Sequence, residues 1–134
     1  VIGLLASIAM PGFMQARKAS RDKCFAANMR SAADAFKTYA IHNGGRYPED
    51  CQPGELPEEM ADYLDNFAWQ KKTPIGGQWD WDYDEFGFTA GVSVYMPSFD
   101  DDRMAEVDAV FDDGNLATGV FRKRSNGYIY VIEQ

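Results

Sequence analysis

The first fourteen residues, Val1–Met14, contain no charged side chain, and they run without a break into an alanine-rich pattern that reaches about Ile41. One helix must therefore meet two different surroundings. Its apolar part requires lipid or other copies of itself, and its amphipathic part requires a globular domain to pack against. We predict two units: an apolar helix segment over residues 1–14, and a globular head over residues 15–134 that includes the amphipathic half of the helix.

The apolar segment is short for a membrane span. Fourteen helical residues cover about 21 Å, whereas a spanning helix needs about 20 residues. The chain begins with Val rather than Met, so we expect further residues upstream. Pro11 removes one hydrogen bond from the helical ladder, and this predicts a kink or local unwinding between Gly3 and Pro11.

The head is predicted to be α+β. Apolar residues at helical spacing, among them Phe25, Met29 and Phe36, give the long helix one face that should pack on a sheet. Other patterns predict a short helix over 57–65, a second short helix over 103–111, and strands over 79–84, 86–94, 118–123 and 128–132. We expect a pilin-like arrangement: a long N-terminal helix on a small antiparallel sheet of about four strands, with two short helices.

The first predicted strand carries a row of aromatic residues, because Trp79, Trp81 and Tyr83 alternate with Asp80, Asp82 and Asp84. Such a row has two interpretations. It is the buried face of a sheet under the helix, or it is an exposed platform that binds a sugar. The buried face is the more common arrangement.

The charge balance limits the partners. The chain has 13 basic and 21 acidic residues and a net charge of −8, which opposes nucleic-acid binding because phosphate contacts require clustered Lys and Arg. Basic residues cluster once, at Arg17, Lys18, Arg21 and Lys23. They form either a solvated helix face beside anionic lipid head groups or a charge contact between filament subunits. The sequence contains no catalytic motif, phosphate loop or zinc spacing, and we predict that the protein is not an enzyme.

The run Ile2-Gly3-Leu4-Leu5-Ala6-Ser7-Ile8-Ala9-Met10-Pro11, followed by Ala16-Arg17, Asn28 and Arg30, resembles the N-terminal helix of type IV pilins and type II secretion pseudopilins. Tyr47-Pro48 and the segments at 74–81 and 112–119 are also similar to pseudopilin-type heads. The leader-peptide cleavage site, the leading Phe and the Glu of that family are absent from this sequence.

The resemblance implies a filament subunit that is anchored in the inner membrane before assembly and then forms part of a periplasmic or extracellular filament. Its partners would be further copies of itself, with minor pilins or the secretion machinery as other candidates. The implied assembly residues lie in the apolar helix: Val1, Ile2, Gly3, Leu4, Leu5, Ile8, Met10, Pro11 and Phe13.

Acidic residues gather late in the chain, at Asp100–Asp102 and at Asp112 and Asp113, with Asp108 between them. Calcium binds about six to eight oxygen atoms, although this spacing does not match an EF-hand loop. Major pseudopilins hold calcium in this C-terminal region as a class, so the resemblance implies a calcium site. Its candidate ligands are Asp100, Asp101, Asp102, Asp112 and Asp113. The alternative is that these side chains cap helix ends.

Two cysteines, Cys24 and Cys51, are present, and an even number in an exported protein favours a disulfide. Cys24 lies about 27 Å before the predicted helix end near His42. A bridge therefore requires residues 43–50 to run back along the helix nearly extended. Otherwise the two residues are separate thiols.

We predict a structural subunit that polymerises through its apolar N-terminal helix into a type IV pilus-like or type II secretion pseudopilus filament. The alternative is a binding module, tethered to a membrane or placed at a filament tip. That module would bind a sugar through the aromatic strand or Ca²⁺ through the acidic loops. Apart from calcium, no cofactor is predicted.

Overall fold

The computed structural model describes the backbone of residues 2–134 and the side chains from residue 12 onward. Its elements are, in order, helix α1 (Ile2–His42), the 3-10 helix η1 (Glu58–Met60), strands β1 (Gln78–Glu85) and β2 (Phe88–Tyr95), helix α2 (Asp101–Phe111), and strands β3 (Phe121–Arg124) and β4 (Gly127–Glu133). The predicted α+β class, with one long N-terminal helix and four strands, is confirmed.

Helix α1 runs without interruption through Met10–Gly12, so the local unwinding predicted near Pro11 is not found. A proline costs the helix one hydrogen bond, and the ladder of this 41-residue helix continues on both sides of it. The helix ends as the sequence predicts. Gly44 and Gly45 follow it at positive φ angles of 69° and 84°, and the Gly45 amide donates to the Ala40 carbonyl at 2.7 Å.

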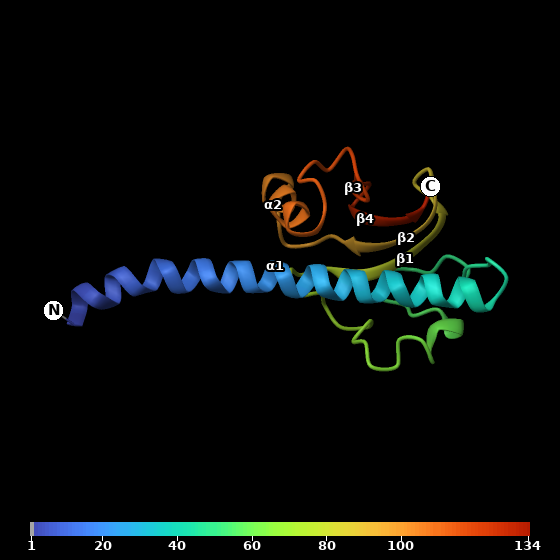
Figure 1. The fold of residues 1–134 in the computed structure, drawn as a ribbon, viewed down its shortest axis with the longest axis horizontal. Coiled ribbons are helices and arrows are strands. Elements are labelled where there is room, and N and C mark those ends of the chain that lie inside the picture. The colour runs from blue at the N-terminus through green and yellow to red at the C-terminus, as the bar shows by residue number, and fades with distance from the viewer. Residues whose placement is uncertain (1) are drawn as a thin grey trace.

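The four strands form one antiparallel sheet in the order β1-β2-β4-β3. Trp81 pairs with Val92, and Val92 pairs with Tyr130, so alternate residues of neighbouring strands share one face. The chain crosses from β2 through α2 before it returns as the β3–β4 hairpin. Figure 1 shows the sheet and α2 on one side of α1, and η1 with the turns that follow it on the other.

The core lies between α1 and the sheet. The Phe36 ring stacks on Trp81 with centroids 3.8 Å apart, and the Phe25 ring stacks on Trp79 at 5.6 Å. All four side chains are buried. The row of strand aromatics is therefore the inner face of the sheet, as predicted. The sugar-platform interpretation is wrong, because the two Trp rings already lie against the helix.

The segment between α1 and β1 differs from the prediction. Instead of a helix over 57–65, only the single 3-10 turn of η1 forms, and the following residues make successive turns. These turns bring Leu64 and Trp69 into the core, where Trp69 lies 5.7 Å from the Phe36 ring and donates through Nε1 to the Glu55 carbonyl. A straight helix would carry Trp69 away from that position.

The last hairpin forms where Asn126-Gly127 predicts it, with a small shift. The two-residue loop is Ser125-Asn126, because Asn126 takes the positive φ of 59° and Gly127 is already the first residue of β4. A side chain at Gly127 would stand 2.3 Å from the Val94 carbonyl oxygen. Gly127 is therefore required for close contact with β2, and not for the turn itself.

Candidate functional site

Much of the N-terminal half of α1 projects beyond the head, and Lys18 contacts the head through an ion pair with Glu106. Every side chain from Gly12 to Arg21 is exposed, and the first buried side chain is Asp22. Phe13 and Met14 are 57% and 64% exposed. Residues 2–21, which we call the stalk, project from the head in Figure 1. Two large apolar side chains are thus exposed next to each other on this projection.

The predicted assembly residues lie on this stalk. Phe13 is exposed, as a contact between subunits requires. Val1 lies outside the described residues. For the others, only the backbone is described, as part of α1: Ile2, Gly3, Leu4, Leu5, Ile8, Met10 and Pro11. Within the part of the chain that the structure describes, no helix combines the length and the apolar character that crossing a bilayer requires.

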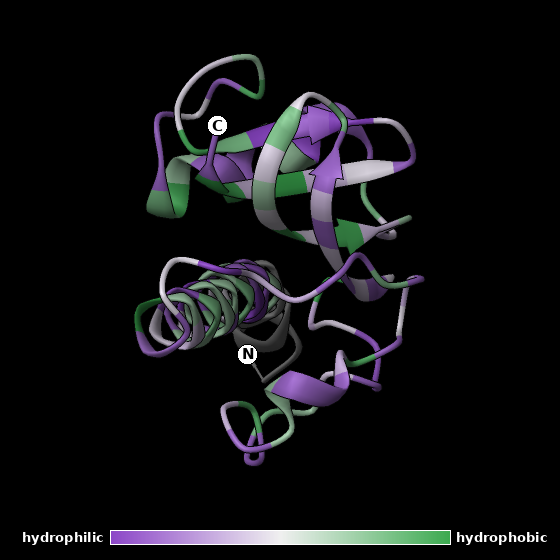
Figure 2. Cartoon of the chain, turned by 90° about the vertical axis from the view of Figure 1, so that its right-hand side faces the viewer, coloured by the Kyte–Doolittle hydropathy of each residue, from purple (hydrophilic) through white to green (hydrophobic). Residues whose placement is uncertain are grey.

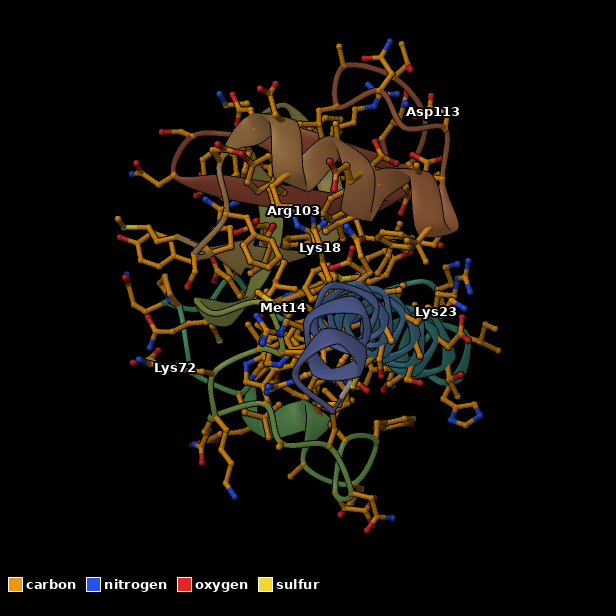
Figure 3. The ribbon with its side chains drawn as sticks, turned by 90° about the vertical axis from the view of Figure 1, so that its left-hand side faces the viewer. Met14, Lys18, Lys23, Lys72, Arg103 and Asp113 are labelled. Carbon is orange, nitrogen blue, oxygen red and sulfur yellow. The ribbon has the colours of Figure 1, made fainter. Side chains whose placement is uncertain are left out.

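In the predicted basic cluster, Lys18 is the residue that forms an ion pair with the head. Lys18 and Arg103 approach one another between α1 and α2 (Figure 3), and both contact Glu106, at 3.4 Å and 3.2 Å. Arg103 also binds Asp22 with two hydrogen bonds, of 2.7 and 2.8 Å. This bidentate pair joins α1, at the first residue beyond the stalk, to α2 and is largely buried.

A cavity of about 530 Å³ lies beside this pair, lined by Met14, Gln15, Arg17, Lys18, Arg21, Phe99 and Arg103. It is basic and partly apolar, and its charge is reduced because Arg103 and Lys18 already have acidic partners. Arg17 lies over the Phe13 ring at 5.7 Å. A surface of this character suits an anionic group next to an apolar one.

The candidate calcium ligands are not gathered at one point. Asp100 caps α2 by accepting a hydrogen bond from the Arg103 amide, which is the capping role left open above. Asp101 accepts hydrogen bonds from Lys123 and Tyr128, and these hydrogen bonds lower the pKa of its carboxyl group. Asp102 is exposed in the first turn of α2. The predicted five-residue ligand set is therefore wrong in its first three members.

Asp112 and Asp113 instead form a cluster with Asp108, in which carboxylate oxygens of all three lie within 4.8 Å of one another. Asp112 Oδ2 accepts from the amides of Val120 and Phe121, both at 2.9 Å. Asp113 accepts from Asn115 and Thr118. These bonds fold the loop after α2 around the cluster.

Asp108 is the member that the loop leaves unsatisfied. It is completely buried, and neither of its oxygens has a partner of normal hydrogen-bond geometry. Burial raises the pKa of its carboxyl group to about 6; the Gly114 amide opposes this effect, and Asp112 and Asp113 add to it. The cluster can therefore hold either a shared proton or a cation.

A second group of charges lies on the outer face of the sheet, away from α1. Arg124 on β3 reaches across to β1, where it contacts Asp80 at 2.7 Å and Asp82 at 3.1 Å. Ser93 on β2 donates to Asp82 and accepts from Arg124. All four side chains are buried. Arg124 also lies 4.4 Å from the centre of the Phe86 ring.

This group has one more acid than base. The pKa of Asp80 is raised to about 8: burial is the largest cause, the neighbouring Asp82 adds to the shift, and Arg124 opposes it. The sequence indicates only that Asp80 and Asp82 point away from the aromatic row. It carries no signal that an arginine from β3, at the opposite edge of the sheet, would cover them.

The predicted disulfide is absent, because Cys24 and Cys51 are free thiols. Cys24 is exposed on α1. Residues 48–54 do run back, as a bridge would require, but they follow the edge of β1, where the Cys51 amide donates to the Trp81 carbonyl and the Gly54 amide to Trp79. The sheet edge, and not the helix, therefore positions Cys51.

No protein-family model, curated protein or solved structure matches this chain.

Proposed function

We propose that this protein is a structural subunit that polymerises through its N-terminal helix into a filament of the type IV pilus or type II secretion pseudopilus kind. The single observation that carries the proposal is the stalk. Among the described side chains of this 41-residue helix, the first that the head buries is Asp22, and the part that projects begins with thirteen residues without a charge, 2–14.

The energetics of the stalk support this role. Helical stability in proteins comes mostly from burial of an apolar face, and the described part of the stalk buries none. Phe13 and Met14 would each contribute about 1.5–3 kcal/mol on full burial. Packing of stalks from many copies would supply that burial, with the membrane taking this place before assembly and the heads lying outside.

The test is electron microscopy of material sheared from the surface of cells that produce the protein, with mass spectrometry of its main band. Thin filaments made chiefly of this chain are the expected result. A chain that stays entirely in the membrane fraction, without filaments, would contradict the proposal. Helical reconstruction of the filaments would then distinguish a pilus from a pseudopilus by its length and its minor subunits.

A second candidate function is calcium binding by the Asp108–Asp112–Asp113 cluster. The observation that favours it is the buried Asp108 carboxylate with two unpartnered oxygens beside two further acids. A calcium ion takes carboxylate oxygens at about 2.3–2.6 Å, and it would neutralise the repulsion that raises the Asp108 pKa. Its role would be to hold the loop after α2, which is compatible with a filament subunit.

A further inference from the structure

Three basic residues form a line along one flank of α1. Lys23, Arg30 and Lys37 are spaced by seven residues, so they drift by only about 20° per step around the helix and span about 21 Å along it. We call them the basic stripe. All three are exposed. None takes part in an ion pair of the described side chains.

The surroundings of the stripe leave its charges available. The guanidinium group of Arg30 lies over the Phe111 ring at 5.7 Å, a contact that orients its charge without neutralising it. Asp34 is the acidic residue next to the stripe on α1, one turn from both Arg30 and Lys37, and it is exposed as well. The stripe therefore keeps a net positive charge on a protein whose total is −8.

An acidic surface lies on another part of the head. Four exposed glutamates, Glu49, Glu55, Glu58 and Glu59, line a cavity of about 410 Å³ around Cys51. No basic side chain lines it. We call these glutamates the acidic flank. These glutamates act on the Cys51 thiol. Burial raises the pKa of this thiol, and nearby carboxylates, with Glu55 first among them, raise it further.

The acidic character continues beyond the flank. Cys51 also lines a second cavity, of about 280 Å³, with Asp50, Asp82 and Glu85 among its walls. The basic residue there, Arg124, is buried and already bound to Asp80 and Asp82. It therefore does not offset the exposed acids.

The stripe and the flank lie on opposite sides of the long axis. The segment that carries the flank continues over Asn28, Ala35 and Tyr39, which are half-buried on one side of α1. The stripe lies about 160° around the helix from these residues. Figure 3, seen along the axis, places Lys23 on one side of α1 and Lys72, from the covering segment, on the other. Figure 2 shows the same segment on one side only.

We infer that the basic stripe of one copy binds the acidic flank of a second copy. Parallel copies set side by side present the stripe side of one to the flank side of the next. The contact uses two different surfaces, so it is heterologous and repeats without closing, as a helical array requires. This inference rests on the proposed filament function and names the contact that sets neighbouring heads.

Both surfaces run along the head. The stripe extends for about 21 Å along α1. Residues 50–54 follow the edge of β1 from Tyr83 to Trp79, which is about 13 Å of strand, and a turn at Gln52–Glu55 leads on towards Glu58 and Glu59. Both surfaces lie at the level of the Phe25–Phe36 core, because β1 stacks on those residues. Neighbouring heads can therefore meet with only a small shift along the axis.

Charge reversal tests this contact in cells. Lys37→Glu and Glu55→Lys each place like charges across the proposed contact, and we expect each to reduce filament abundance by about tenfold. The double variant restores the pairing with its signs exchanged, and we expect it to return filaments to near the wild-type level. Lys72→Glu and Asp102→Lys reverse equally exposed charges outside both surfaces and should leave filaments unchanged.

The outcomes separate this inference from the proposed function. Wild-type cells without filaments would refute the function itself. Normal filaments in both single variants would refute the contact alone. Loss in both singles without recovery in the double variant would also refute this pairing. Loss of Lys37→Glu protein from the membrane fraction would assign the stripe to lipid head groups instead. Circular dichroism of each purified variant confirms that its head is folded.

Carbodiimide cross-linking of wild-type filaments gives independent evidence. The reagent joins an amine to a carboxylate only where the two are in contact. We expect linked peptides that pair Lys23 or Lys37 with the 49–59 segment, and only in assembled filaments. Recovery of the Lys18–Glu106 link, which lies within one chain at 3.4 Å, serves as the positive control. That link without any stripe–flank link would contradict the inference.

Discussion

Asp80 carries a carboxyl group that is buried beside one other acid and a single arginine. Its pKa is about 8 in the folded protein, against an ordinary value of 3.8. A raised pKa means that the folded state holds the proton more tightly than the unfolded state. The resulting stability is fully present below about pH 4 and is lost as the pH rises through about 8.

We therefore expect the free energy of unfolding to decrease between about pH 5 and pH 8, and the Asp80→Asn variant to show a smaller decrease. Asparagine keeps the shape of the side chain and leaves Asp82 and Arg124 as a balanced pair. Chemical denaturation at several pH values measures the slope. Asp65→Asn, at an exposed position, is the control. An Asp80→Asn slope equal to that of wild type would contradict this account of the sheet face.

Arg124→Met should lower the free energy of unfolding. At neutral pH Asp80, with its pKa of about 8, is mostly protonated. Removal of the guanidinium therefore leaves the buried Asp82 carboxylate without a positive partner, which costs about 3–5 kcal/mol. The same denaturation curves at neutral pH provide the measurement. We expect Arg124→Met to be much less stable than wild type, whereas an unchanged stability would show that both acids are protonated in the folded state.

Asp108 supplies the test of calcium binding. At about pH 7, above its pKa of about 6, the cluster is charged and should bind the ion. A calcium concentration of about 100 times Kd stabilises the folded protein by about 2.7 kcal/mol, which is equivalent to a Tm increase of about 8 °C. The increase should vanish in Asp108→Asn and weaken at pH 5. A Tm that does not respond to calcium at pH 7 would refute this site.

The spacing of these acids shows what sequence reasoning can resolve at this scale. Asp108 precedes Asp112 by four residues, so the two share one face at the end of α2, and this signal could have identified the cluster. Asp100 and Asp101 could not be excluded in the same way. The partner of Asp100 is local, since the Arg103 amide follows three residues later, and it gives the N-cap that was the alternative interpretation. The partners of Asp101, Lys123 and Tyr128, become its neighbours only in the folded chain.

Among the elements, α1 and β1 hold the head together through stacked rings. Phe36 contributes the tightest stack, with Trp81 at 3.8 Å, and it also contacts Trp69. We expect Phe36→Ala to destabilise the head by about 3–5 kcal/mol, because removal of a buried aromatic ring leaves a cavity. Thermal unfolding followed by tryptophan fluorescence measures it. Phe13→Ala, on the exposed stalk, should leave the Tm within about 1 °C.

Long elements with a strong period were predictable. The helical spacing of Phe25, Met29 and Phe36 and the alternation of Trp79, Trp81 and Tyr83 identified α1 and β1 and paired their buried faces. The segment between them was predicted poorly. Its local pattern resembles a helix, but the need to bring Trp69 against Phe36 overrides that preference. The position of Trp69 is determined by tertiary packing, and this kind of contact produces no periodic pattern in the local sequence.

At the scale of the whole molecule, the stalk and the head are expected to respond independently to substitution. Leu4→Asp or Leu5→Asp places a charge in the apolar segment, where filament packing leaves it without water. We expect either change to abolish filaments while the isolated head keeps its fold. Electron microscopy and circular dichroism measure the two properties. Filaments at normal abundance in either variant would count heavily against assembly through this segment.

The attachment of α1 to the sheet also has a mechanical consequence. The helix is about 61 Å long, and the head holds it only along the part from Asp22 onward. A pull on the stalk therefore acts parallel to the helix and loads the Phe25 and Phe36 stacks together, in shear. Detachment of the helix would have to separate both stacks at once, and could not separate them one after the other. A subunit connected in this way can bear tension along its own axis, with the load shared between both stacks.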